Sequence, residues 1–144
     1  MTDTTAKNQL EHICIAWIED DSDVIFGVVK PLIKQGVTIN TYYNYAEAIN
    51  HIDEIRDCDL ILLDIILPPG ASDEKGNSLG IKLLRLLRNE YQVKMPIIIF
   101  SIVANASDII STSELESLGA QALPKGITPQ ELKTEVIEIL GLSG

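Results

Sequence analysis

Apolar residues along the chain follow two alternating patterns, one typical of β-strands and one typical of α-helices. Five short apolar segments, rich in Ile, Leu and Val, are too short for buried helices and predict strands. The predicted strands span residues 12–19, 37–43, 59–67, 96–101 and 119–125. In the segments that follow them, apolar residues recur every three or four positions, which predicts helices. The predicted helices span residues 22–36, 46–56, 79–91, 107–118 and 128–140.

Capping residues support several of these helix boundaries. Ser22 is the predicted N-cap of the first helix, Gly36 its C-cap, and Thr128 the N-cap of the last helix. Pro31 lies inside the first helix and is expected to kink or shorten it, because proline lacks the backbone N–H that continues the helix. The glycines at 70, 76 and 80 lack the motif of a phosphate-binding loop and are interpreted as loop flexibility.

Strands that alternate with helices through short loops predict a doubly wound α/β fold with one parallel sheet. Right-handed crossovers place helices on both faces of that sheet. Residues 59–67 are apolar without alternation, which indicates a central strand covered on both faces. Residues 1–11 are interpreted as a flexible tail and residues 12–142 as one domain, with no output domain expected.

The composition fits a single folded domain and narrows its partners. The 144 residues are 46% hydrophobic and 22% charged, and 11 basic against 21 acidic side chains give a net charge of −10. This charge argues against binding to nucleic acid or to an anionic membrane surface. No apolar segment approaches the roughly 20 residues of a membrane span, and the N-terminus lacks the apolar core of a signal peptide. Cys14 and Cys58 lie in apolar segments, which favours packed, reduced thiols in the cytoplasm over a disulfide or a metal site.

Polar residues gather where the predicted strands end. In a doubly wound sheet, the ligand site lies outside the carboxyl ends of the strands. The residues at those ends are Glu19, Asp20, Asp21, Asp64, Ser101 and Lys125. Carboxylates brought together repel one another unless a cation neutralises them, and oxygen ligands without His or Cys favour Mg²⁺.

Four motifs at these positions together resemble the receiver domain of two-component response regulators. They are WIEDD (17–21), LILLDIILPPG (60–70), IIIFS (97–101) and LPKG (123–126), and the resemblance covers about residues 12–142. The resemblance implies a flavodoxin-like fold with strand order 2-1-3-4-5.

The resemblance also implies a role for each site residue. Asp64 would be the phospho-acceptor, whose carboxylate attacks a phosphoryl group and becomes an acyl phosphate. Asp20 would bind Mg²⁺ directly, Glu19 would bind it through water, and the backbone carbonyl of Ile66 would be a third ligand. A further alternative is a small phosphatase with an aspartyl nucleophile. Such enzymes usually need a second acid two residues after the nucleophile, and Ile66 occupies that position, which argues against phosphatase activity.

Further positions match the family only in part. Ser101 corresponds to the hydroxyl that bonds the phosphoryl group, and Lys125 to the ammonium that pairs with it. Ala122 occupies the position of the usual aromatic switch residue. Ile102 replaces the usual Ala or Gly and is expected to limit access to the acceptor.

The implied function is that of a single-domain response regulator in a phosphorelay. A sensor histidine kinase or a phosphotransfer protein would phosphorylate it with Mg²⁺, and the phosphorylated form would bind a protein target through the fourth helix, fifth strand and fifth helix. It would be a switch rather than an enzyme, with at most self-phosphorylation and slow self-dephosphorylation. The alternative is a receiver-like adaptor that binds partners without phosphorylation, which Ala122 and Ile102 favour.

Overall fold

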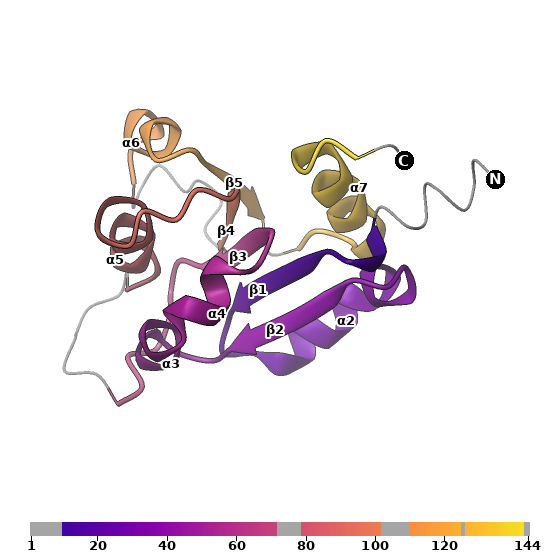
Figure 1. The fold of residues 1–144 in the computed structure, drawn as a ribbon, viewed down its shortest axis with the longest axis horizontal. Coiled ribbons are helices and arrows are strands. Elements are labelled where there is room, and N and C mark those ends of the chain that lie inside the picture. The colour runs from indigo at the N-terminus through magenta and orange to yellow at the C-terminus, as the bar shows by residue number, and fades with distance from the viewer. Residues whose placement is uncertain (1–9, 72–78, 102–109, 125, 143–144) are drawn as a thin grey trace.

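The computed structural model describes residues 10–71, 79–101, 110–124 and 126–142, which form five strands and the helices that cover them (Figure 1). The strands are β1 (Cys14–Ile18), β2 (Thr38–Tyr42), β3 (Leu60–Asp64), β4 (Ile97–Ser101) and β5 (Ala120–Pro124). They pair in parallel in the order β2-β1-β3-β4-β5. The prediction of a doubly wound sheet with strand order 2-1-3-4-5 is therefore confirmed.

The helices pack in two layers, one on each face of the sheet. Their bounds are α2 (Ser22–Lys34), α3 (Tyr45–Asn50), α4 (Ile52–Arg56), α5 (Leu79–Arg85), the π-helical segment η1 (Leu86–Glu90), α6 (Thr112–Ser117) and α7 (Pro129–Ile139). Buried residues of α2 and α7 share one core with one face of the sheet, and those of α3, α4, α5 and η1 share the other (Figure 1). All five residues of β3 are buried, as its apolar pattern predicts for a central strand. None of the helices in the described part of the chain has the length and hydrophobicity of a membrane-spanning segment.

The first helix differs from its prediction at both ends. Asp21, rather than Ser22, occupies the N-cap position, because its side-chain Oδ1 accepts the backbone N–H of Asp23 at 3.1 Å. Pro31 does not shorten the helix, which continues to Lys34. Gly36 then takes a φ of +95°, and the Val37 N–H bonds back to the Leu32 carbonyl, which forms the predicted glycine C-cap.

Two other boundaries also differ from the sequence interpretation. The second predicted helix divides into α3 and α4 at His51, whose ring Nδ1 donates to the Glu47 carbonyl at 2.7 Å. The His51 backbone N–H bonds to Ala48 instead, so the regular helical hydrogen bond is lost there. Leu10, within the segment predicted as a flexible tail, belongs to a helical turn and is 4% exposed in the core shared by α2 and α7, while residues 1–9 of that segment lie outside the described residues.

Arg88 in η1 connects the segments that lead into β4 and β5. Its guanidinium donates to the carbonyls of Val93 and Met95, which precede β4, and of Leu118 and Gly119, which precede β5. Burial lowers the pKa of Arg88. This side chain therefore fixes the entry of both strands, whose other ends lie at the edge of the sheet where the site residues gather.

Candidate functional site

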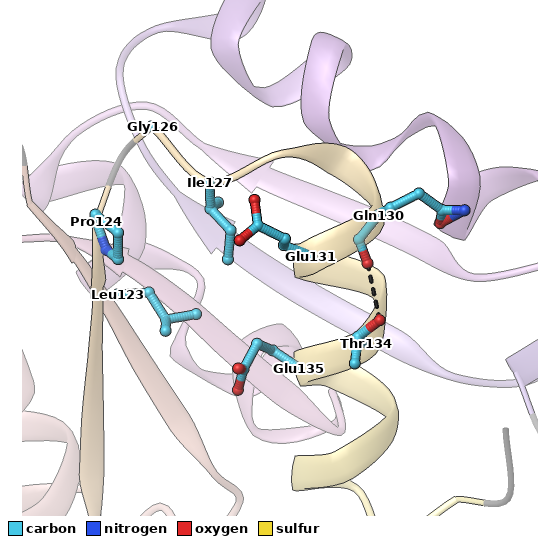
Figure 2. Close-up of a pocket in the computed structure, with 8 residues that line it drawn as sticks. All are labelled: Leu123, Pro124, Gly126, Ile127, Gln130, Glu131, Thr134 and Glu135. Atoms are coloured by element: carbon cyan, nitrogen blue, oxygen red, sulfur yellow. Dashed lines mark hydrogen bonds between the residues drawn. The ribbon is translucent and has the colours of Figure 1, made fainter.

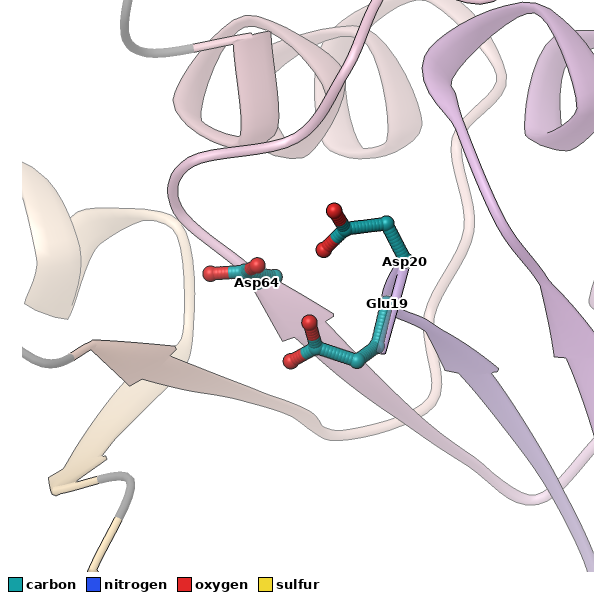
Figure 3. Close-up of side chains that lie close together, drawn as sticks. All are labelled: Glu19, Asp20 and Asp64. Carbon is teal, nitrogen blue, oxygen red and sulfur yellow. The ribbon is translucent and has the colours of Figure 1, made fainter. Parts of the chain in front are cut away.

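Three carboxylates meet at the carboxyl end of the two central strands. Glu19 and Asp20 directly follow β1, and Asp64 is the last residue of β3. Because Ile18 pairs with Leu63 in the sheet, both strands end at the same level. One carboxylate oxygen from each of the three residues lies within 4.8 Å of the others (Figure 3). The sequence prediction that these residues converge is confirmed by this geometry.

Backbone hydrogen bonds extend the sheet by one residue beyond each strand and so position the acids. The Glu19 N–H donates to the Tyr42 carbonyl of β2 at 3.0 Å, and the Ile65 N–H donates to the Phe100 carbonyl of β4 at 3.1 Å. Glu19 is 0% exposed and Asp64 is 2% exposed, whereas Asp20 is exposed. The cluster therefore has two acids inside the protein and one facing solvent.

The donor set of this cluster fits Mg²⁺. Repulsion among shielded carboxylates destabilises their ionised forms unless a cation binds. Two oxygens on opposite sides of one Mg²⁺ are about 4.2 Å apart, so a spacing within 4.8 Å needs little adjustment. The site offers only oxygen ligands and few of them, and Mg²⁺ commonly completes its shell with water. Glu19, Asp20 and Asp64 would hold the ion.

The first turn of α2 is organised by the same acidic segment. The Glu19 Oε1 accepts the Asp21 N–H at 3.4 Å, and the Asp21 carbonyl accepts the Ile25 N–H at 3.3 Å. Asp21 thus caps the helix, a role its type and position could have suggested. The acidic run divides into two functions, with Glu19 and Asp20 at the cluster and Asp21 at the helix start.

The chain after Asp64 turns sharply and is anchored to the start of α3. The Ile66 N–H donates to Asp64 Oδ1 at 3.2 Å, which places the Ile66 backbone beside the Asp64 carboxylate. The Ile66 side chain is 47% exposed at this edge. Beyond it, the carbonyls of Pro68 and Pro69 accept the N–H groups of Tyr45 and Ala46 at 2.8 and 3.2 Å. Metal binding by the Ile66 carbonyl stays a prediction.

Gly80 contributes to the site, and its interpretation as loop flexibility was wrong. It is a buried residue in the first turn of α5, and its N–H donates to the Ile65 carbonyl at 2.9 Å. A Cβ atom at this position would lie 1.9 Å from the Asp64 carbonyl oxygen. Only glycine lets the helix approach the end of β3 this closely, a tertiary contact that sequence spacing does not reveal. Gly70, with a φ of +67°, does serve its turn, and Gly76 lies outside the described residues.

The remaining predicted site residues are only partly described. Ser101 ends β4 and pairs with Pro124 of β5, so its backbone lies at the same edge of the sheet as Asp64, which pairs with Phe100. Lys125 and Ile102, like the Ser101 side chain, lie outside the described residues. Ala122 lies within β5 opposite Ile99, so the switch position is occupied by a small side chain on this strand.

Comparisons with known proteins agree with this arrangement. The family model for the response regulator receiver domain matches residues 15–137. The chain is 29% identical to a two-component response regulator from Clostridium difficile, with a TM-score of 0.71 over 90% of this chain and 97% of that one. It is 26% identical to the BeF3-activated N-terminal receiver domain of RstA from Klebsiella pneumoniae, with a TM-score of 0.69 over 88% and 97% of the two chains.

A more distant structure shares the fold. The CheY-like response regulator receiver domain protein from Methanospirillum hungatei is 22% identical, with a TM-score of 0.70 over 90% of this chain and 94% of that one. The comparison with curated proteins finds no match. The family model matches most of the chain, and this match shows the family. The five-stranded sheet with acids at its carboxyl edge agrees with it. The chain belongs to the response regulator receiver domains.

Proposed function

We propose that this receiver domain is a phosphorylation-dependent switch that takes a phosphoryl group on Asp64 with the help of Mg²⁺. Receiver domains in general bind Mg²⁺ at an acidic pocket and receive phosphate from histidine kinases or phosphotransfer proteins. The observation that carries the proposal is the position of Asp64, at the end of the central strand and within 4.8 Å of Glu19 and Asp20. We also propose that the protein does not turn over an external substrate.

The chemistry asks little of the protein beyond positioning and charge neutralisation. A carboxylate oxygen of Asp64 forms a bond to phosphorus while the bond from phosphorus to the donor nitrogen of a phosphohistidine breaks, and the imidazole leaves with the electron pair. When bound, Mg²⁺ would neutralise charge on the phosphoryl oxygens. The hydrogen bond from the Ile66 N–H to Asp64 Oδ1 holds the carboxylate in a fixed orientation.

Ser101 and Lys125 would complete the site around the phosphoryl group. The pairing of Ser101 with Pro124 brings the end of β4 and the end of β5 to the edge that Asp64 occupies. A hydroxyl there can donate to a phosphoryl oxygen, and an ammonium can pair with its charge. We assign these two roles to Ser101 and Lys125. Ile102, next to Ser101, would restrict the approach of the donor or of water.

The direct test is phosphorylation by a small-molecule donor. The protein is incubated with acetyl phosphate or phosphoramidate and Mg²⁺, and its intact mass is measured. We expect the gain of one HPO₃, lost when Mg²⁺ is chelated and lost in Asp64→Asn. Asp53→Asn, which changes an exposed acid of α4 in the same way, should keep the gain. A full gain in Asp64→Asn would refute the assignment of the acceptor.

A phosphoryl analogue tests the metal assignment separately. The Klebsiella relative is a BeF3-activated receiver domain, and we expect BeF₃⁻ with Mg²⁺ to bind this chain. Trp17 reports on binding, since its buried ring stacks on Phe100 at 5.6 Å and Phe100 pairs with Asp64. Its fluorescence should change with BeF₃⁻ and Mg²⁺ in the native protein and stay constant in Asp20→Asn. An equal response in that variant would contradict a role for Asp20 in metal binding.

The downstream partner would be a protein that binds α6, β5 and α7. A groove of about 420 Å³ lies between the end of β5 and α7, and Figure 2 shows the residues that line it. Its lining residues are Leu123, Pro124, Gly126, Ile127, Gln130, Glu131, Thr134 and Glu135. Apolar side chains come from the β5 side and carboxylates from α7, so the groove suits a partner segment with apolar and basic residues.

One observation favours the second candidate, an adaptor that does not use phosphate. Ala122 in β5 offers no ring that could rotate between exposed and buried positions, so the usual coupling of acceptor to partner face is missing. An adaptor would bind its protein target equally with and without BeF₃⁻ and Mg²⁺. The switch requires affinities that differ, because a ligand shifts a two-state equilibrium only by its differential affinity.

A further inference from the structure

Two cysteine thiols lie in contact at the end of the sheet opposite the acidic cluster. Cys14 begins β1, and Cys58 lies two residues before the start of β3. Their Sγ atoms are 2.7 Å apart, and both cysteines are free thiols. The spacing is already near the 2.05 Å of a disulfide bond. Two residues 44 positions apart in the chain are thus placed to react with each other.

Polar groups form hydrogen bonds with the two sulfurs and with the backbone of Cys14. The Asn40 side-chain Nδ2 of β2 donates to the Cys14 Sγ at 3.4 Å and to the Cys58 Sγ at 3.8 Å. The Cys58 Sγ donates to the Glu54 carbonyl at 3.6 Å, and the Asp59 carboxylate accepts the Cys14 backbone N–H at 2.8 Å. One amide therefore supports a thiolate on either sulfur, while the backbone of Cys14 is fixed.

Solvent reaches the pair through Cys14, and Cys58 is buried beside a cleft. Cys14 is partly exposed, and Cys58 lines a cleft of about 410 Å³. The rest of that cleft is formed by Arg56, Gln92, Val93, Lys94 and Met95. A small oxidant can therefore approach without unfolding of the domain. Burial, and secondly the hydrogen bond with Cys14, raise the pKa of the Cys58 thiol.

We propose that Cys14 and Cys58 are a modification site, at which a peroxide converts the two thiols reversibly into an intramolecular disulfide. The thiolate of Cys14 attacks a peroxide oxygen, the O–O bond breaks, and the departing hydroxide takes a proton to become water. The Cys14 sulfenic acid is then attacked by the Cys58 sulfur, the S–O bond breaks, and a second water leaves. Two thiols lose two electrons, and one peroxide accepts them.

Cys14 is the first nucleophile because it is the more exposed thiol, and Cys58, buried and with a raised pKa, is the resolving one. The product would tie the start of β1 to the segment that leads into β3. Glu19 and Asp64 lie at the other ends of these two strands. A cross-link between residues this far apart in sequence restricts the unfolded chain and stabilises the fold. The site is independent of the proposed phosphorylation of Asp64.

The test treats the native protein with hydrogen peroxide and follows intact mass and disulfide-linked peptides under non-reducing conditions. We expect a loss of two hydrogen atoms, a peptide pair joined through Cys14 and Cys58, reversal by dithiothreitol, and a melting temperature about 5 to 10 °C higher. Asp64→Asn should behave in the same way, which separates this result from the phosphorylation. Thiols that persist, or dimers linked between chains, would overturn the proposal.

Variants test the roles of the individual residues. Oxidation of Cys58→Ser should stop at a Cys14 sulfenic acid that dimedone traps. Faster trapping at Cys58 in Cys14→Ser than at Cys14 in Cys58→Ser would overturn the order of attack. Asn40→Ala should slow disulfide formation by about five-fold, the rate change that matches one hydrogen bond. Thr41→Ala changes the next residue of β2, which bonds to the Tyr43 hydroxyl, and should leave the rate unchanged. Equal rates of disulfide formation in the two variants would contradict a role for Asn40 at the site.

Discussion

Replacement of Gly80 by alanine tests how closely α5 fits against the end of β3. A Cβ atom at this position would lie 1.9 Å from the Asp64 carbonyl oxygen and 2.6 Å from the Ile65 carbonyl oxygen. Both atoms belong to backbone that the sheet holds in place, so a side-chain rotation cannot relieve the overlap. Ordinary van der Waals contact begins near 3.4 Å, so helix and strand would have to separate by about 1.5 Å.

Three contributions set the expected size of the effect. Overpacking of this kind costs about 1 to 3 kcal/mol. Separation also weakens the hydrogen bond from the Gly80 N–H to the Ile65 carbonyl, worth about 1 kcal/mol. Alanine in a helix returns about 1 kcal/mol through its higher helix propensity. The free energy of unfolding should therefore fall by about 2 kcal/mol, and the melting temperature by about 6 °C.

The assay is urea denaturation of Gly80→Ala, with Gly27→Ala as the matched control. Gly27 also lies inside a helix, α2, but a Cβ there has no neighbour within 4 Å. The control should become more stable by about 1 kcal/mol, because only helix propensity changes. Displacement of the Asp64 backbone should also slow phosphorylation in Gly80→Ala alone. If both variants gained equal stability, the close fit of α5 against β3 would be refuted.

Other predictions address the scaffold around the site. Arg88→Ala should lower the free energy of unfolding by about 3 kcal/mol, because four carbonyls lose a partly buried donor. Arg85→Ala removes an exposed pair with Glu114 and should cost less than about 1 kcal/mol. Equal losses in denaturant titrations would contradict this. Hydrogen bonds of the Thr128 side chain and backbone lower the pKa of Glu131. A pKa depressed in the folded state stabilises the fold above the unfolded pKa, near 4.3, and this contribution is lost as the pH falls below it. The stability difference between native protein and Glu131→Gln should therefore shrink between about pH 5 and pH 3, and a constant difference would refute the coupling.

The alternation of strands and helices could be predicted from the sequence because each strand is an apolar run and each crossover has helical spacing. The convergence of Glu19, Asp20 and Asp64 followed from topology alone, since parallel strands end at a common edge. Where the prediction was wrong, side-chain to backbone contacts decided the outcome. His51 breaks a helix through its ring, and Asp21 takes the cap expected of Ser22.

Gly80 shows a different limit of sequence interpretation. Its position beside a polar loop suggested flexibility, yet it is required by a contact with backbone 16 residues earlier in the chain. Nothing in the local sequence encodes that approach, because the contact arises only when α5 packs against β3. Likewise, the proximity of Cys14 and Cys58 depends on the register of β1 and β3 rather than on their spacing.

The central claim is that Asp64 itself carries the phosphoryl group. After incubation with acetyl phosphate and Mg²⁺, reduction with borohydride converts an aspartyl phosphate into homoserine, which peptide mass spectrometry can locate. The account predicts homoserine at position 64, present only when donor and Mg²⁺ are both supplied. Homoserine at another acid such as Asp20, or an unmodified residue 64 in protein that has gained phosphate, would contradict it.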